Sequence, residues 1–248
     1  MARDQLEGRN VVIEALSRGR RKVLGIWLDE RAKSGGKVDE LLSRAAAAGV
    51  PVRHVSRQVL DRQSQTGVHN GVIAEAEPLP EHTVRSLLGE LESRGEEPFL
   101  VLVDEIQYEH NLGAILRSSL GAGVNGVIVP VQRGKGLSPV VQRVAMGAAE
   151  VVPLVREGLS SALATLRRAR IRVVGCDMDG GSLWETPLTG PIALVLGGED
   201  KGLTPTLRKR CDDIVAVPLQ GGLESLNVSV TGALVMFEKV RQERASRR

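Results

Sequence analysis

The stretch from Ile192 to Leu203 reads Ile192-Ala-Leu-Val-Leu-Gly-Gly-Glu-Asp-Lys-Gly-Leu203 and joins a continuous apolar run to a glycine-rich loop. Five consecutive apolar residues are typical of a strand that is buried on both faces of a parallel sheet. Three glycines in the loop let backbone groups approach a ligand closely. Because ligands of open α/β sheets bind at the carboxyl ends of strands, this stretch predicts an α/β fold and a place for its site.

The same kind of apolar run recurs through the C-terminal two-thirds of the chain. Phe99-Leu-Val-Leu-Val103 is the clearest example. Further strands are expected at 127–129, 151–155, 172–175 and 214–217, and helices at 112–120, 140–146, 159–168, 204–210 and 228–240. This alternation predicts an α/β domain with a largely parallel sheet.

The residues before Pro80 form a separate, smaller α/β pattern. Helices are expected at 10–18 and 37–48, and strands at 23–28, 52–55 and 72–76. Glu77-Pro-Leu-Pro80 stiffens the chain and ends this module. We therefore expect an N-terminal domain at 1–78, a linker with a short helix at 79–98, and a second domain at 99–248.

Composition narrows the class of protein. The chain is 42% hydrophobic and 25% charged, but only 2% aromatic, which disfavours binding that stacks many bases on exposed rings. Cys176 and Cys211 lack the paired spacing of a zinc site, so no metal is expected. The chain opens on charged residues and has no run of about 18 apolar residues, which predicts a cytoplasmic protein without a membrane span.

The charge is unevenly distributed. The net charge is +3, from 33 Lys and Arg against 30 Asp and Glu. Residues 1–80 carry 13 basic and 10 acidic side chains, which leaves 20 of each for residues 81–248. The surplus therefore lies in the N-terminal module, where it is consistent with a polyanion-facing surface, although solvated surfaces often vary as much.

One glycine pattern is misleading. Gly121-Ala-Gly-Val-Asn-Gly126 matches the glycine fingerprint of dinucleotide-binding folds, which requires a strand before it and a helix after it. Here a helix precedes and a strand follows, so a nicotinamide or flavin site is not expected. The chain contains no P-loop pattern either.

Two further segments carry candidate site residues. Val217-Pro-Leu-Gln-Gly-Gly-Leu-Glu-Ser-Leu-Asn227 follows a predicted strand and opens the last helix, so that it surrounds the same sheet edge as the first loop if their strands are neighbours. His110-Asn-Leu-Gly-Ala-Ile-Leu-Arg117 follows the 99–103 strand, with Asn111 expected at the helix N-cap.

Each candidate also has a simpler interpretation. Ser225 or Asn227 alone would serve as a helix cap, and Glu199 alone as a solvated loop carboxylate. Arg117 falls off the apolar stripe of its helix and would then be a solvated charge. The cluster Arg167, Arg168, Arg170 and Arg172 is expected to be a solvated helix end, with RNA contact as the alternative. His69 and His110 are expected to make local hydrogen bonds.

The three segments together, in this order and separation over residues 100–240, resemble the signature motifs of the SpoU methyltransferases of the SPOUT class. The N-terminal module, with Gly8-Arg-Asn-Val-Val-Ile-Glu-Ala-Leu16 and Thr66-Gly-Val-His-Asn-Gly-Val-Ile73, is similar to the substrate-binding extension of the bacterial 23S rRNA guanosine 2′-O-methyltransferase branch. That extension has the fold of kink-turn-binding ribosomal proteins. One departure is that Tyr108-Glu109 stands where many relatives have Asp-Pro, which puts the conformation of this loop in question.

The resemblance implies a C-terminal trefoil knot, a homodimer and methyl transfer from S-adenosylmethionine to a ribose 2′-hydroxyl of RNA, either 23S rRNA or a pre-ribosomal particle. Arg117 would be the catalytic cation or base, oriented by Glu199, with Asn111 and Asn227 holding ribose and loops. The cofactor would be bound by Leu196, Gly197, Gly198, Leu219, Ser225 and Leu226. The alternatives are the same reaction on tRNA or at a thiopeptide-resistance site of rRNA, or a non-catalytic RNA-binding ribosome-assembly protein.

Overall fold

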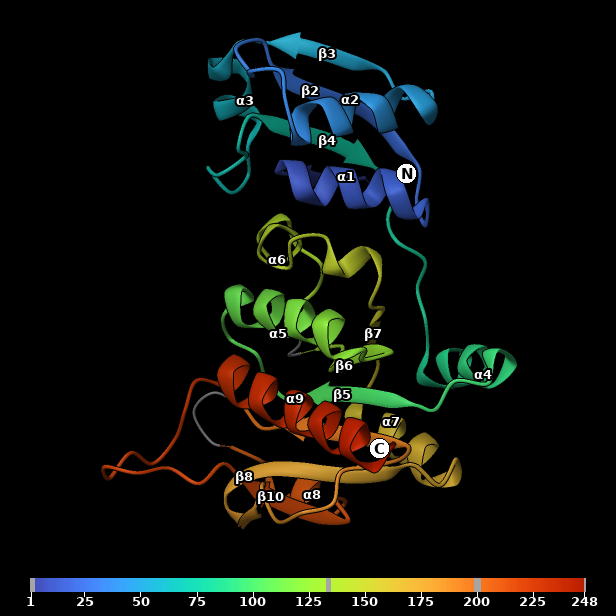
Figure 1. The fold of residues 1–248 in the computed structure, drawn as a ribbon, viewed down its shortest axis with the longest axis vertical. Helices are drawn as coiled ribbons and strands as arrows, with labels where there is room; N and C mark the ends of the chain where they lie inside the picture. The colour runs from blue at the N-terminus through green and yellow to red at the C-terminus, as the bar shows by residue number, and fades with distance from the viewer. Residues whose placement is uncertain (1–2, 133–134, 199–201, 248) are drawn as a thin grey trace. The chain divides into compact units, whose positions relative to one another are not determined.

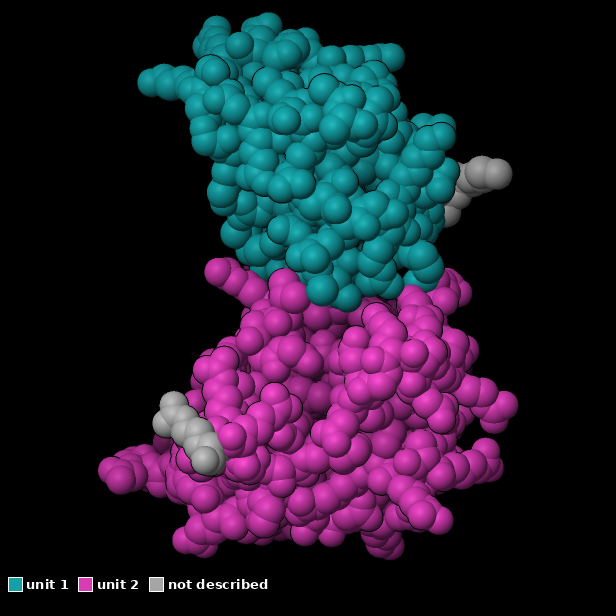
Figure 2. Space-filling model, turned by 45° about the vertical axis from the view of Figure 1, so that its right-hand side comes forward, with its two compact units in different colours: residues 1–80, 137–151 teal, residues 81–136, 152–248 magenta. Residues whose placement is uncertain are grey.

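A computed structural model describes residues 3–132, 135–198 and 202–247 of the chain. The chain forms two compact units (Figure 2). Unit 1 comprises residues 1–80 and 137–151, and unit 2 comprises residues 81–136 and 152–248. Within the described ranges, no helix is both long enough and apolar enough to cross a membrane.

Unit 1 is built on a four-stranded sheet with the order β1-β4-β2-β3. Its strands are β1 (Asp4–Glu7), β2 (Val23–Asp29), β3 (Val52–Val55) and β4 (Val72–Ala76), and its first helices are α1 (Arg9–Arg18), α2 (Lys37–Ala47) and α3 (Arg57–Gln63). β4 pairs antiparallel with β1 and β2, whereas β2 and β3 are parallel. The apolar faces of α1 and α2 pack with the sheet in one core that includes Leu6, Val12, Leu28 and Leu41.

Two elements of unit 1, β1 and α3, were not predicted from the sequence. β1 reads Asp-Gln-Leu-Glu and has no apolar alternation, yet it pairs with β4 through Leu6 and Ala74. α3 buries only Leu60 and therefore has no apolar stripe. Tertiary pairing, rather than local pattern, stabilises both elements.

The segment 137–151 completes unit 1, although in sequence it interrupts unit 2. It contains α6 (Pro139–Val144) and the 3-10 turn η1 (Ala148–Glu150). Glu150 is buried there and forms an ion pair with the buried guanidinium of Arg21. Arg21 also donates to Gln142 Oε1 at 2.6 Å and to Asp4 Oδ2 at 2.7 Å.

Unit 2 contains a six-stranded sheet with the order β10-β8-β9-β5-β6-β7, in which every neighbouring pair is parallel. The strands are β5 (Phe99–Val103), β6 (Gly126–Val129), β7 (Leu154–Arg156), β8 (Arg172–Ser182), β9 (Ile192–Leu196) and β10 (Asp213–Ala216). The predicted α/β class and parallel sheet are confirmed. All residues of β5 and β9 are buried, as their continuous apolar runs indicated.

Helices cover both faces of this sheet (Figure 1). α4 (Val84–Arg94), α7 (Leu159–Arg168) and α8 (Pro205–Arg208) share one core with Leu100 and Leu102 of β5. α5 (Glu109–Ala122) and α9 (Val228–Ser246) lie side by side in the ribbon view, with Met236 of α9 in contact with Ser119 of α5. The glycine pattern at 121–126 lies between α5 and β6, in the helix-then-strand order that the sequence predicted.

Two predicted strands differ clearly from the observed ones in their bounds. The strand expected at 151–155 begins later, as β7 at Leu154–Arg156. The Val151 amide still belongs to the η1 turn, because it donates to the Ala148 carbonyl. The strand expected at 172–175 continues to Ser182, because its later residues pair with Val215 and Ala216 of β10 across a register shift.

Candidate active site

The carboxyl ends of β9 and β10 and the middle of β8 line a cavity of about 620 Å³ in unit 2. This volume lies in the range of small-molecule sites, roughly 300–1,000 Å³. Its walls combine apolar side chains with carboxylate, hydroxyl and amide groups. All six residues expected to bind a cofactor line it: Leu196, Gly197, Gly198, Leu219, Ser225 and Leu226.

The loop after β9 is shaped by its glycines. Gly198 and Gly202 exchange two backbone hydrogen bonds, of 2.9 and 3.2 Å, that close the loop on itself. A Cβ on Gly197 would stand 2.6 Å from the carbonyl oxygen of Gly202 and from the amide nitrogen of Leu203, which is closer than any side chain tolerates. Glu199 belongs to residues 199–201, which lie outside the described residues.

Asn111 and Asn227 meet at the cavity. The Asn227 Nδ2 donates to Asn111 Oδ1 at 3.1 Å, and both residues line the cavity. Asn227 also caps α9, since its Oδ1 accepts from the Ser229 amide at 2.9 Å. Asn227 therefore caps α9 and lines the cavity at the same time.

The position of Asn111 differs from the prediction. The N-cap of α5 is Tyr108, and Asn111 lies in the first helical turn, where its amide donates to the Tyr108 carbonyl. Glu109 begins the helix, and a carboxylate there is favoured by the positive end of the helix dipole. The side chain of Asn111 is thus not a cap and faces Asn227 instead.

Arg117 lies apart from this pair. It is exposed on α5 and does not line the cavity. Six residues of α-helix separate it from Asn111, which rotates its side chain by roughly 240° around the helix axis. The structure of the single chain therefore brings Asn111 and Asn227 together with the six loop residues, but not Arg117.

Asp177 is a cavity residue that the sequence patterns missed. Its carboxylate accepts from the amides of Leu203 at 3.2 Å and Met178 at 2.8 Å, and it forms an ion pair with Arg208 at 3.4 Å. The two loops were expected to share a sheet edge if their strands were neighbours, but β8 lies between β9 and β10. The middle of β8, which bears Asp177 just past the point where β9 ends, is therefore part of the site. Its place directly after an apolar run was the signal that could have found it.

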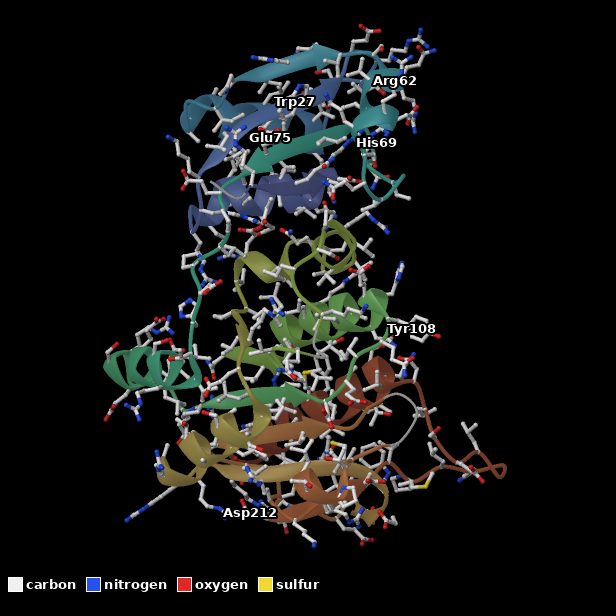
Figure 3. All side chains as sticks on the ribbon, turned by 180° about the vertical axis from the view of Figure 1, so that it is seen from behind. Trp27, Arg62, His69, Glu75, Tyr108 and Asp212 are labelled. Carbon is white, nitrogen blue, oxygen red and sulfur yellow. The ribbon has the colours of Figure 1, made fainter. Side chains whose placement is uncertain are left out.

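Two more lining residues differ sharply in accessibility. Tyr108 is 65% exposed and projects outward from unit 2 (Figure 3). Cys176 is buried in the cavity wall, and that burial raises the pKa of its thiol to about 12. A neutral thiol is a poor nucleophile, so Cys176 serves as wall rather than as a reacting group.

Comparison with known proteins places this geometry in a family. Residues 98–237 match the model of the SpoU rRNA Methylase family, and residues 5–82 match the model for RNA 2′-O ribose methyltransferase substrate binding. The chain belongs to the SpoU rRNA methylase family. The three segments that build the cavity all lie within the first match.

Relatives of this SpoU protein extend over nearly its whole length. It is 38% identical over 247 residues to the 23S rRNA (guanosine-2′-O-)-methyltransferase RlmB of Pseudomonas putida, which covers 98% of both chains. The RlmB of Shewanella oneidensis is 36% identical over the same share of both chains. The matches therefore include the N-terminal module as well as the methylase region.

Solved structures of methyltransferases resemble this chain over most of its length. The SpoU methyltransferase AviRb from Streptomyces viridochromogenes, in complex with AdoMet, superimposes with a TM-score of 0.80 at 25% identity and covers 98% of this chain and 90% of that one. A crystal structure of an RNA 2′-O ribose methyltransferase gives a TM-score of 0.78 at 26% identity, with 97% of this chain and 88% of that one covered.

Proposed function

We propose that this SpoU protein transfers a methyl group from S-adenosylmethionine to the ribose 2′-hydroxyl of a guanosine in 23S rRNA. The observation that carries the proposal is the cavity beside the carboxyl ends of β9 and β10, which gathers residues of all three signature segments into one site. Relatives that match 98% of the chain bear the name of this activity. Acting on ribosomal RNA, the protein would work in the cytoplasm.

The cavity has the features that S-adenosylmethionine requires. Leu196, Leu219 and Leu226 offer apolar contacts for a base, while the close backbone of Gly197 and Gly198 offers hydrogen bonds without side-chain interference. Ser225 adds a hydroxyl. The cofactor, when bound, supplies an electrophilic methyl group on a sulfonium.

Arg117 is our candidate for activating the ribose hydroxyl. A guanidinium stays protonated in proteins, so we assign it the role of a cation that binds the adjacent phosphate and stabilises the developing alkoxide. Glu199 would orient it by charge-assisted hydrogen bonds, and Asn111 and Asn227 would hold the ribose and the loops.

The exposed position of Arg117 supports a site that is completed in a homodimer. On the same layer of unit 2, Val230, Leu234 and Phe237 form an exposed apolar stripe on α9, at spacings of four and three residues. Val235 and Met236 of the same helix are buried. A helix that is apolar on both sides is expected to pack on both sides.

For the domain roles we keep the predicted division, although α4 packs in the core of unit 2 and residues 137–151 belong to unit 1. We assign RNA-substrate binding to residues 1–78, with a fold like that of kink-turn-binding ribosomal proteins, linker function to 79–98, and catalysis to 99–248. The substrate-binding model matched at 5–82 supports the first assignment. The trefoil knot at the C-terminal end is what the family resemblance implies for this chain.

Coverage favours rRNA over tRNA. The Aquifex aeolicus TrmH/SpoU tRNA modifying enzyme covers 66% of this chain, against 98% for the RlmB relatives. We take the uncovered part to be the N-terminal module, which the substrate-binding model matches.

Ribose-methylation mapping of total RNA from a deletion strain tests the substrate. Loss at one guanosine of 23S rRNA, restored by the wild-type gene, is the expected result. Loss of ribose methylation in tRNA, or at another rRNA site, would show that the substrate is a different RNA. Intact methylation together with no S-adenosylmethionine binding in calorimetry would indicate a non-catalytic RNA-binding protein.

Arg117→Ala and Arg117→Lys test the catalytic assignment. At saturating cofactor and RNA, both should lower kcat by at least about 100-fold, the size of effect seen when one transition-state donor is removed. Binding of S-adenosylmethionine should not change, because Arg117 does not line the cavity. Near-normal methyl transfer by Arg117→Ala would show that the role is wrong.

A further inference from the structure

A second cavity in unit 2, of about 660 Å³, is rich in arginine. Its basic residues come from the last turn of α7, the turn that follows, the first residue of β8, and the segment between α8 and β10. They are Arg167, Arg168, Arg170, Arg172 and Arg210. The sequence had predicted a solvated helix end for the first four, but Arg210 joins them from 38 residues farther along the chain, counting from Arg172.

Two of these arginines are held in place by the fold. Arg172 forms an ion pair with Asp213 at 2.7 Å and donates to the Pro187 carbonyl at 2.6 Å. Arg210 donates to the Ser160 carbonyl at 3.1 Å. The bond from Arg210 to a carbonyl does not cancel its charge, so this guanidinium contributes to the positive field of the cavity. The charge of Arg172 is offset by Asp213.

The other three, Arg167, Arg168 and Arg170, are exposed and form no ion pair with any described residue. Asp212 is the acidic residue of the lining, and its Oδ2 accepts from the Val173 amide at 2.8 Å. Three guanidinium groups are thus available to an anion. Cations are favoured at the C-terminus of a helix, which explains an arginine in the last turn of α7. It does not explain why Arg172 of β8 and Arg210 line the same cavity.

The backbone at Arg170 strengthens this interpretation. Arg170 follows the C-cap Ala169 with a left-handed φ of 57°. In the same position α2 has Gly49, at φ 66° after the C-cap Ala48, and glycines also close α1, α4 and α5. A non-glycine residue there costs about 1 kcal/mol, so the stability of α7 alone would favour glycine.

The arginine cavity is separate from the candidate active site. It lies at the amino end of β8, whereas Asp177 lies five residues farther along, roughly 17 Å at about 3.3 Å per residue. Tyr108 and Asp212, each lining one of the two cavities, are well apart within unit 2 (Figure 3).

We propose that the arginine cavity binds the phosphodiester backbone of the RNA substrate at a point remote from the methylated ribose. Guanidinium groups pair with phosphate oxygens in bidentate geometry, and several in one concave surface suit a polyanion better than a single small anion. The contacts would position the RNA without reading its sequence. This inference rests on the proposed function, because it takes RNA as the substrate.

The test compares two variants that each remove three positive charges. The pocket variant combines Arg167→Gln, Arg168→Gln and Arg170→Gly. The control combines Arg85→Gln, Arg94→Gln and Arg244→Gln, three exposed arginines outside both cavities. Arg94 is a matched choice, because it lies in the last turn of α4 just before a left-handed residue.

Filter binding of a 23S rRNA transcript between 50 and 200 mM salt gives the readout. Each lost phosphate contact lowers the slope of log K against log salt by about 0.7–0.9, so the pocket variant should lose about 2 in slope and bind at least about tenfold more weakly at low salt. Its KM for RNA should rise while kcat and cofactor binding stay unchanged. Arg170→Gly relieves strain, so weaker binding cannot be attributed to unfolding.

The inference is overturned if the pocket variant keeps the affinity and slope of the wild type, or if the control loses as much as the pocket variant. Failure of the proposed function looks different. In that case the wild-type protein itself does not methylate the transcript, whatever the two variants do.

Discussion

Asn227 and Asn111 join the starts of two helices across 116 residues of sequence, through a hydrogen bond of 3.1 Å from Asn227 Nδ2 to Asn111 Oδ1. The other side-chain atom of Asn227 caps α9 by accepting from the amide and hydroxyl of Ser229. One amide side chain therefore stabilises α9 and ties it to α5 at the rim of the cavity. The two roles use different atoms and can be separated.

Asn227→Ser separates them. Serine is also a good N-cap but is too short to reach Asn111, so we expect the free energy of unfolding to change by less than about 0.5 kcal/mol. Loss of the bond to Asn111 should lower methyl transfer at least about tenfold. Thermal unfolding and single-turnover kinetics measure the two effects. Asn227→Ala is the control, since it should lose both the activity and about 1 kcal/mol of stability. Equal activity of Asn227→Ser and wild type would contradict the role of the bond.

Gly197→Ala should remove cofactor binding. The new Cβ would stand 2.6 Å from the backbone of Gly202 and Leu203, so the loop after β9 must shift, at a cost of about 1–3 kcal/mol. Gly181→Ala in β8 is the control, because its Cβ comes no closer than 3.8 Å to a described atom and Gly181 does not line the cavity. Calorimetry with S-adenosylmethionine and urea unfolding compare the two. Similar stability of both variants would show that the close approach at Gly197 is not required.

Arg21→Met should destabilise unit 1. The guanidinium of Arg21 is fully buried and pairs with the buried carboxylate of Glu150, which the substitution would leave without its partner. Breaking such a pair costs about 3–5 kcal/mol. Urea unfolding of Arg21→Met and of the double variant Arg21→Met/Glu150→Leu measures this. The double variant should recover part of the loss, because Glu150 is no longer left charged and unpaired, whereas Asp4 and Gln142 still lose their donor. A loss as large as that of Arg21→Met would argue against the ion pair with Glu150 as the cause.

Alkaline pH should destabilise unit 2 through Cys176. Burial raises the pKa of its thiol to about 12 in the folded chain, from an ordinary value of 9.0. The unfolded chain therefore loses this proton first, and the stabilising contribution, complete below pH 9, is lost as the pH rises toward 12. Cys176 accounts for about 1.4 kcal/mol of that loss at pH 10. The difference in unfolding free energy between pH 8 and pH 10 should shrink by this amount in Cys176→Ala. An unchanged difference would contradict the burial effect.

Much of the fold was predictable because its strands are buried on both faces. β5 and β9 are continuous apolar runs, and such runs are visible in sequence without knowledge of the pairing. β1 was not predictable, because its four mostly polar residues are a strand only through pairing with β4. The segment 137–151 is a similar case, since its place in unit 1 depends on the buried contact of Glu150 with Arg21.

The candidate site likewise has some features that the sequence predicted and others that only the tertiary structure shows. By itself the sequence determined the loops that line the cavity, because glycines and polar residues after apolar runs mark the carboxyl edge of a parallel sheet. Only the tertiary structure decided that β8 lies between β9 and β10, which brings Asp177 into the cavity, and that Asn111 faces Asn227 instead of capping its helix. Strand order and side-chain direction arise from packing between distant segments, whereas periodicity and loop chemistry are local. For the same reason Arg210 joins the arginines of α7 and β8 only in the folded chain.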